Sequence, residues 1–219
     1  MISFSTADIV VNLLFAARWT LLLACVTFVG GSVLGAVILV GRVVKYRSIN
    51  GLCRLYVEAL QGTPLLMQLF LIYFALGLLG VDLPPLMAAC LGLILWSSAF
   101  LAEIWRGCVN AIERGQWDAS ASLGMGLSQQ LRYVIVPQAT RIAVPPTVGF
   151  LVQVVKGTAV TSLIGFIELS RAGAMMSNAT FRPFLVYGCV AIIYFILCWP
   201  LSRWSKLLEK KLHAPYRHN

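Results

Sequence analysis

Four ionisable side chains lie inside or beside long apolar stretches of this 219-residue sequence: Glu58, Glu103, Lys156 and Glu168. A charge inside a membrane-like environment is costly unless it is paired or wet, so such groups bind a charged solute, line a gate or hold a scaffold together. Glu103 and Arg106 are three residues apart, the spacing of an ion pair on one helix face. We therefore expect Glu58 and the Glu103–Arg106 pair to be gate or scaffold groups.

Lys156 differs from the carboxylates because it lies in an uncharged run and precedes Gly157. Glycine can break a helix, and the backbone groups it frees are tolerated only inside protein or beside a water-filled cavity. We expect residues 156–161 to line a substrate pathway; the alternative is that Lys156 snorkels to the outer surface. Thr158 and Thr161 belong to this pathway segment. Four uncharged polar residues in the second and third spans either line the same route or form hydrogen bonds between helices: Thr63, Gln68, Ser97 and Ser98.

Groups that could catalyse a reaction are not brought together by the sequence. Both histidines, His213 and His218, are in the tail, and no nucleophile with a base or metal-ligand cluster is evident. The six cysteines are scattered without C-x-x-C spacing, which favours buried thiols over ligands or disulfides. We expect no catalytic site and no metal site, and a membrane enzyme is disfavoured.

The composition requires a membrane around these residues. Hydrophobic residues make up 59% of the chain and charged residues 11%, and the mean hydropathy is +0.85. Five stretches have about the 20 apolar residues that a spanning helix needs, at 19–41, 55–77, 83–102, 142–167 and 183–202. Residues 1–17 are expected to be an amphipathic lead-in at one face, and whether 142–167 splits into two half-spans is left open.

The basic residues give these spans an orientation. Of the 17 Lys and Arg, thirteen fall in the loops after the first, third and fifth spans, and four fall elsewhere. Cytoplasmic loops carry the excess of Lys and Arg, so we expect the N-terminus outside and the C-terminus inside. The same distribution explains the net charge of +9 without nucleic acid as a partner.

Glycine and proline mark where the spans turn and pack. Pro64 is expected to kink the second span, as a packing feature first and a gate hinge second. Glycines and prolines between 77 and 85 predict a tight outer turn, which makes the second and third spans a hairpin. Gly31 and Gly35 form a small-xxx-small pair, and packing within one subunit is favoured over dimerisation.

Residues 116–137 form a polar, helix-capable segment between the third and fourth spans. Asp118 suits a helix start, where an acidic side chain complements the helix dipole, and Gly124 would end that helix. A second short helix would begin at Ser128 as N-cap and stop before Pro137. We expect a compact two-helix knob whose small side chains fit a groove on another protein.

The spacing in this segment resembles the EAA loop of ABC-transporter permeases, which reads Glu-Ala-Ala, three residues, Gly, nine residues, Ile-x-Leu-Pro. The matching residues are Asp118, Ala119, Ser120, Gly124 and then Val134, Ile135, Val136 and Pro137, with Asp for Glu, Ser for Ala, and Val for Ile and Leu. EALQGTPLL at 58–66 and AEIWRG at 102–107 resemble the Glu-x-x-Arg-Gly-Thr-Pro-Leu and Ala-Glu-x-x-Arg-Gly segments of polar amino-acid permeases. The resemblance runs from the second to the fourth span.

This resemblance implies an all-α integral membrane protein of about five transmembrane helices with the type I (MetI-like) ABC importer fold. It implies a single permease domain over 1–219, with a cytoplasmic coupling loop at about 114–137. The chain would be the bacterial inner-membrane permease subunit of an ATP-driven importer and form the path for a polar amino acid. The alternative is a stand-alone secondary transporter or channel, although the spans lack the paired carboxylates of an ion relay.

The partners implied by the resemblance are two cytoplasmic ABC ATPases, a second permease that is identical or similar, an extracytoplasmic solute-binding protein and the lipid bilayer. The sequence contains no G-x-x-x-x-G-K-[ST], so we expect no cofactor in this chain and expect ATP and Mg²⁺ to be bound by the ATPase. The coupling residues would be Asp118, Ala119, Ser120, Gly124 and Pro137. Asp118 would hold the helix start and meet a cation, and Gly124 would allow the turn.

Two stretches bear on the cargo and the gate. Many relatives have Lys-Asp-Thr-Ser where this chain has Lys156, Gly157, Thr158 and Ala159, so the carboxylate that would suit an ammonium group is missing. Either a non-identical partner subunit supplies that carboxylate, or this subunit only lines the path. Glu168 begins a segment that in relatives carries a gating helix; a solvated loop face is the alternative.

Overall fold

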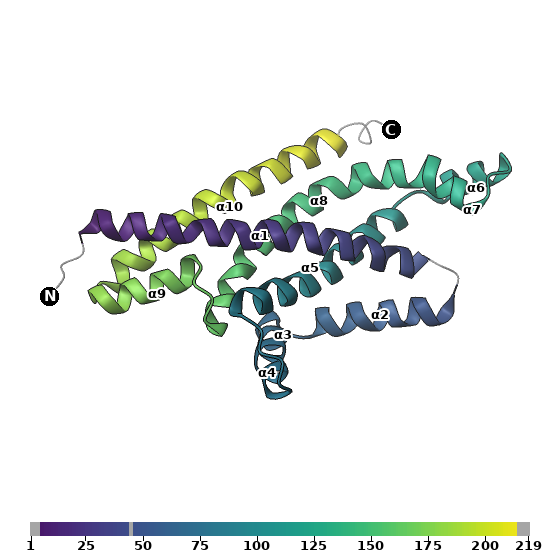
Figure 1. Ribbon diagram of the computed structural model, residues 1–219. Coiled ribbons are helices and arrows are strands. Elements are labelled where there is room, and N and C mark those ends of the chain that lie inside the picture. The colour runs from purple at the N-terminus through teal and green to yellow at the C-terminus, as the bar shows by residue number, and fades with distance from the viewer. Residues whose placement is uncertain (1–4, 44–45, 214–219) are drawn as a thin grey trace.

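The computed structural model describes residues 5–43 and 46–213, and every regular element within them is a helix (Figure 1). Four helices are long and apolar enough to cross a membrane: Thr6–Val43, Pro85–Asn110, Leu127–Ile164 and Pro183–Leu212. A bent pair, Arg47–Gly62 with Leu65–Leu78, supplies a fifth span. The prediction of an all-α protein with about five spans is confirmed.

Helix α1, Thr6–Val43, is a single 38-residue helix. The predicted amphipathic lead-in over residues 1–17 is therefore wrong for its described part, and residues 1–4 lie outside the described residues. Ile9, Leu13 and Ala17 lie on one side of the first turns and are buried against α9 and α10. Their spacing of four residues continues the apolar face of the helix, so no break separates them from the span.

Two glycines let α1 approach α5, Pro85–Asn110, closely. A Cβ added to Gly35 would lie 3.0 Å from the carbonyl oxygen of Ser98, and one added to Gly31 would collide with the Ser97 hydroxyl. The small-xxx-small pair thus packs inside this subunit, as the sequence predicted.

The second span is broken. Helix α2, Arg47–Gly62, meets α3, Leu65–Phe70, at an angle of 107°, because Thr63 and Pro64 are both extended. The expected kink at Pro64 exists, but it is a sharp bend between two helices and not a curve in one. A π-helical stretch, η1 (Leu71–Ala75), and α4, Leu76–Leu78, continue from α3 away from the bundle (Figure 1).

The turn from α4 into α5 has the predicted chemistry. Gly80 has a φ of 81°, in the left-handed region that glycine tolerates, and Pro84 precedes the first residue of α5.

The six cysteines are all unpaired thiols, three of them half-buried, two buried and one exposed.

The fourth span is one continuous stretch of helix from Leu127 to Ile164. It comprises α7 (Leu127–Gln129), the π-helical η2 (Gln130–Ile135), α8 (Val136–Gly157) and the 3-10 helix η3 (Thr158–Ile164). The split into two half-spans, which the sequence left open, does not occur. The expectation that a helix stops before Pro137 is wrong. The wide π turns ahead of Pro137 accommodate a residue that has no N–H and that would crowd an ordinary α-helical turn.

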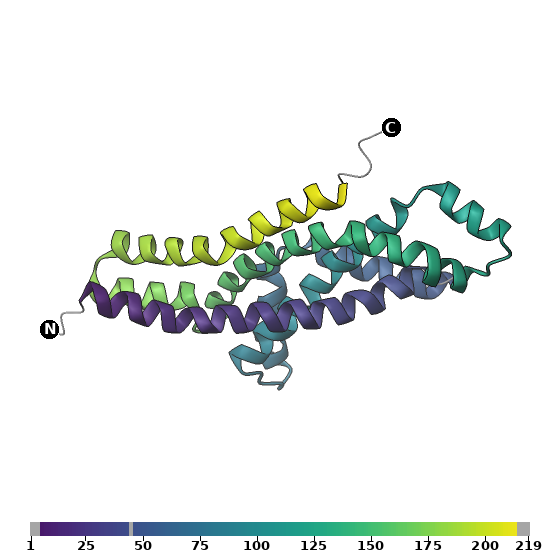
Figure 2. The same cartoon turned by 90° about the horizontal axis from the view of Figure 1, so that it is seen from above.

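The chain closes with α9, Leu169–Thr180, and α10, Pro183–His213. Helix α9 contacts the first part of α1 and the start of α10. Both views place α6, Arg114–Ser122, at the far end of the bundle from the N-terminus, near the end of α1 (Figures 1 and 2). The end that carries α6 is also the one at which α1 ends and α2 begins.

Candidate functional site

The segment predicted to be a knob is a short helix closed by a glycine turn. Gly124 has a φ of 73°. The N–H of Gly124 donates to the Ala121 carbonyl at 2.9 Å and that of Met125 donates to the Ser120 carbonyl at 3.2 Å. This pair of bonds is the Schellman motif, in which a left-handed residue satisfies the last carbonyls of a helix. The predicted role of Gly124 in the turn is confirmed by its geometry.

The boundaries of the knob differ from those expected. Helix α6 begins at Arg114 after Glu113, so Asp118 is the fifth residue of the helix and does not hold its start. The next helix begins after Gly126 and not at Ser128, and the Gln129 side chain accepts the N–H of Gly126 at 3.1 Å. The sequence misplaced both starts because several polar residues in this segment are suitable caps.

One face of α6 is anchored and the other is free for a partner. Ser120 is buried, and Trp117 packs on a cluster formed by Ile112, Ile135 and Ala139. Gln138 on α8 donates to the Gln116 side chain at 3.1 Å. The exposed residues of α6 and its glycine turn include Asp118, Ala119, Ala121, Ser122, Leu123 and Gly124, and Pro137 is exposed nearby. The knob therefore presents small side chains on a support that is fixed to the fourth span.

The bend in the second span is held by Gln68. Its amide nitrogen lies 2.7 Å from the Leu60 carbonyl oxygen and 3.0 Å from that of Thr63, both at the end of α2. Thr63 in turn donates its hydroxyl to the Ala59 carbonyl at 2.8 Å. Thr63, Pro64 and Gln68 thus form one local unit that caps α2 and fixes the direction of α3.

The serine pair on α5 connects three helices. The Ser97 hydroxyl donates to the Thr27 carbonyl on α1 at 3.2 Å. The Ser98 hydroxyl lies 2.8 Å from the hydroxyl of Tyr56 on α2. Both serines are fully buried. The structure places them in hydrogen bonds between helices, the second of the two roles that the sequence left open, and their part in a pathway stays a prediction.

The stretch that follows Lys156 changes from α-helix to 3-10 helix. The hydroxyls of Thr158 and Thr161 donate to carbonyls three residues earlier, at 2.8 and 2.7 Å, and both side chains are buried. Gly157 keeps right-handed helical angles, and the chain turns only at Gly165, whose φ is 89°. The break expected at Gly157 is thus a change of helix type.

Lys156 itself is exposed on α8, where the sequence placed a pathway. Next to it, a Cβ at Gly157 would lie 3.5 Å from Leu65 at the bend and 3.5 Å from the Trp96 ring on α5. Trp96 also contacts Phe100 and Phe150, with ring centroids 5.3 and 5.4 Å away. The structure therefore brings the bend, α5 and the 3-10 segment together. Sequence reasoning missed Trp96 and Leu65, because each is one apolar residue in a long apolar run.

The charged gate or scaffold residues form pairs within single helices. Arg54 Nε lies 2.6 Å from Glu58 Oε1, and both side chains are more than half exposed. Arg106 Nε lies 2.9 Å from Glu103 Oε2, and a second guanidinium nitrogen contacts the other carboxylate oxygen. The predicted Glu103–Arg106 ion pair is confirmed.

Glu168 has a completely buried side chain, so a solvated loop face is excluded for this residue. It is the N-cap of α9 and accepts the backbone N–H groups of Ser170 and Arg171 at 2.9 and 3.0 Å. The Tyr194 hydroxyl on α10 donates to it at 2.9 Å, and the Thr20 hydroxyl on α1 lies 3.4 Å away. Glu168 therefore ties α1, α9 and α10 together.

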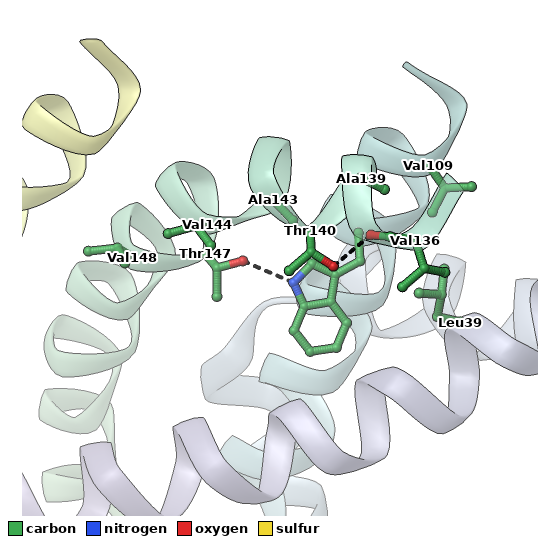
Figure 3. Close-up of a pocket in the computed structure, with 10 residues that line it drawn as sticks. Leu39, Val109, Val136, Ala139, Thr140, Ala143, Val144, Thr147 and Val148 are labelled. Carbon is green, nitrogen blue, oxygen red and sulfur yellow. Dashed lines mark hydrogen bonds between the residues drawn. The ribbon is translucent and has the colours of Figure 1, made fainter. Parts of the chain in front are cut away.

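A groove of about 420 Å³ opens between α1, α5 and α8 (Figure 3). The indole N–H of Trp105 donates to the Thr147 hydroxyl at 2.9 Å, and the Thr140 hydroxyl donates to the Val136 carbonyl at 2.7 Å. The lining is otherwise aliphatic: Leu39, Val109, Val136, Ala139, Ala143, Val144 and Val148. The sequence did not indicate this groove, because its residues come from three separate spans.

Known proteins with similar sequences are transport permeases. The family described as binding-protein-dependent transport system inner membrane component matches residues 28–214. The chain is 33% identical over 193 residues to the probable amino-acid ABC transporter permease protein YckA of Bacillus subtilis (strain 168), covering 88% of this chain and 85% of that protein. It is 32% identical over 202 residues to the glutamine transport system permease protein GlnP of Escherichia coli (strain K12), covering 91% and 92%.

Solved structures give the same fold. A chain of the crystal structure of an amino acid ABC transporter with histidines superposes with a TM-score of 0.88 at 33% identity, covering 91% of this chain and 94% of that one. A chain of the inward-facing MetNI methionine ABC transporter superposes with a TM-score of 0.75 at 20% identity, covering 91% and 96%, a likeness of fold alone.

Proposed function

The chain belongs to the family of binding-protein-dependent transport system inner membrane components, and we propose that, as a permease subunit of an ABC importer, it carries a polar amino acid. The family is a non-catalytic transport component with several membrane spans. The proposal for the cargo is supported by the curated relatives, whose names specify amino acids in general or glutamine. It is also supported by two stretches that resemble polar amino-acid permeases: GTPLL, which contains the bend, and AEIWRG, which contains the Glu103–Arg106 pair.

The observation that carries the coupling role is the exposed face of α6 on its fixed support. An ATPase that moves on nucleotide binding can transmit that motion only through a contact that is rigid on the permease side. The knob is rigid because Ser120 and Trp117 are packed and Gln138 bonds to Gln116. We propose that residues 114–137 dock on a cytoplasmic ATPase, that two such ATPases bind ATP and Mg²⁺, and that residues 1–219 act as one permease domain.

The remaining partners and the orientation follow from this assignment as proposals. The end of the bundle with α6 would face the cytoplasm, so the N-terminus would lie outside the bacterial inner membrane and the C-terminus inside. A solute-binding protein would deliver the cargo to the opposite face, and a second permease, identical or similar, would complete the path. Asp118 makes no ion pair within the described residues, so its carboxylate is available for a cation on the ATPase.

Transport in reconstituted vesicles tests the function. The purified complex would be identified subunit by subunit by mass spectrometry, its binding protein screened calorimetrically against the twenty amino acids, and uptake of the best ligand measured with and without ATP. Uptake that needs ATP, the ATPase and the binding protein supports the proposal. Uptake that proceeds unchanged without them supports a stand-alone secondary transporter or channel and overturns the proposal.

The coupling surface has its own test. Leu123 is 77% exposed at the tip of the knob, so Leu123→Ser removes an apolar contact without disturbing the core of the permease. We expect the ATPase to dissociate from the complex or to lose stimulation by the loaded binding protein. Leu207→Ser on α10, at a leucine that is 51% exposed, is the matched control and should keep both. Equal behaviour of the two variants would remove the support for docking at α6.

A further inference from the structure

The lining of the groove between α1, α5 and α8 is almost entirely apolar. Its only hydrogen-bonding side chains, Trp105, Thr140 and Thr147, already donate to acceptors within the protein or accept such a bond. Figure 3 shows Val136, Thr140, Val144 and Val148 following one another along α8, with Leu39 of α1 beside Val136. A ligand that fits this lining must be a flexible hydrocarbon.

The length of the groove matches one leaflet of a bilayer. Val136 and Val148 are twelve residues apart, about 18 Å along α8 at about 1.5 Å per residue. One leaflet contributes about half of a hydrocarbon core of about 30 Å. Helix α1 exposes a stripe of valines at intervals of three or four residues: Val29, Val33, Val37 and Val40, all at least 63% exposed. The exposed face of α1 is therefore as apolar as the lipid around a spanning helix.

Positive charge stands at one end of the groove. Arg42 lies one turn beyond Leu39 at the end of α1, and Arg132 lies one turn before Val136 on the fourth span. Neighbours at this spacing share a helix face. Arg132 is exposed and Arg42 is half-buried, and within the described residues neither forms an ion pair with a carboxylate. Arg42 and Arg132 thus lie one helical turn beyond the groove lining at this end, and Arg42 also interacts electrostatically with Glu103 on α5.

We infer that this groove binds an anionic phospholipid, with one acyl chain between α1, α5 and α8 and the phosphate at Arg42 and Arg132. Basic residues next to a crevice between spanning helices recognise anionic headgroups, and each contributes about 1 kcal/mol at the membrane surface. A neutral lipid would fill the groove without using the arginines. The inference depends on the spanning helices and not on the cargo or on the ATPase contact.

Native mass spectrometry of the purified complex tests the headgroup contact. The complex would be delipidated, mixed with equal amounts of phosphatidylglycerol and phosphatidylcholine, and scored for lipid retained per permease. We expect phosphatidylglycerol to be preferred, and Arg42→Gln or Arg132→Gln to lower that preference about five-fold each. Arg203→Gln is the matched control, because Arg203 is exposed on α10. Helix α10 packs on the other side of α8, where Ser205 donates to the Pro145 carbonyl.

A second variant tests the acyl chain. Ala143→Leu would fill the groove and should lower the retention of both lipids, whereas Ala191→Leu, at an exposed position on α10, should leave retention unchanged. Equal retention of the two lipids by the unmodified complex, or equal loss in Arg203→Gln and Arg42→Gln, overturns the headgroup contact. Unchanged retention in Ala143→Leu overturns the acyl-chain site. A chemical cross-link from Val144→Cys to the second permease would show a protein in the groove and would also overturn the inference.

Discussion

Replacing Glu168 should loosen α9 from the bundle, because its carboxylate caps the start of that helix, where the Thr20 hydroxyl holds only the N–H of Leu169 at 3.1 Å. Glu168→Ala removes an acceptor from the N–H groups of Ser170 and Arg171 and from the Tyr194 hydroxyl. Loss of an N-cap costs about 0.5–2 kcal/mol. A buried donor left without a partner costs about 1–3 kcal/mol. Together these costs are about 1.5–5 kcal/mol, and because the Ser170 hydroxyl lies 2.9 Å from the Tyr194 hydroxyl and remains its partner, we expect a net loss in the lower half of that range.

Thermal unfolding of the purified complex in detergent, followed by tryptophan fluorescence, measures this loss. About 1 kcal/mol shifts the melting temperature by about 2–4 °C for a chain of this size. Glu168→Gln keeps one acceptor oxygen and the side-chain volume, so its shift should be smaller than that of Glu168→Ala.

The matched control for this prediction is Glu113→Ala. Glu113 is also the N-cap of a helix, but it is exposed and its side chain forms no cap hydrogen bond. We expect no measurable change in the melting temperature for this variant. If Glu168→Ala and Glu113→Ala melt at the same temperature, the buried network does not hold α9 and the reasoning is refuted.

Three further changes probe other contacts. Gly31→Ala puts a methyl group onto the Ser97 hydroxyl and should lower the melting temperature by several degrees. The control is Gly188→Ala, where a Cβ meets nothing within 4 Å and the melting temperature should not change. Equal melting temperatures of the two variants would contradict the close approach of α1 and α5. Gln68→Leu removes the hydrogen bonds across the bend and should speed amide hydrogen exchange over residues 63–67, whereas unchanged exchange would assign the bend to Pro64 alone. Gly124→Val forces a β-branched residue to a φ of 73° at an exposed turn, so the complex should still assemble while ATP hydrolysis uncouples from uptake. Gly124→Asn should retain coupling, because asparagine tolerates the left-handed region. Normal transport by the valine variant would count against the role of the turn.

The sequence predicted those parts of the fold that depend on local chemistry. Apolar length located the five spans, and Gly124 and Gly80 marked turns that need a left-handed residue. The pair Glu103 and Arg106 was predictable because both partners lie on one helix turn. In each case the residues that determine the structure are within a few positions of one another.

The parts that the sequence did not predict depend on partners far away in the chain. Thr20 and Tyr194 lie 148 and 26 residues from Glu168, and each is only one polar residue in an apolar run. The size of the bend at Pro64 is fixed by Gln68 bonding back across it, a contact that composition does not reveal. Periodicity shows that a face is buried, but not which helix buries it.

The error over Pro137 matters most for how the protein works. A helix that stopped there would have left the knob on a hinge, whereas helix in fact runs without interruption from Leu127 to Ile164. Its first turns carry the anchor of α6 at Ile135 and Gln138, and its last turns hold Gly157 against Leu65 and Trp96. Because 38 residues of helix extend about 57 Å at about 1.5 Å per residue, a tilt imposed at the knob must move the segment beside the bend. The softer turns along this path are the π-helical stretch at Gln130–Ile135, the turn around Pro145 and Pro146 inside α8, and the 3-10 stretch after Gly157. The first and the last lie at the two ends, where such a lever must change direction.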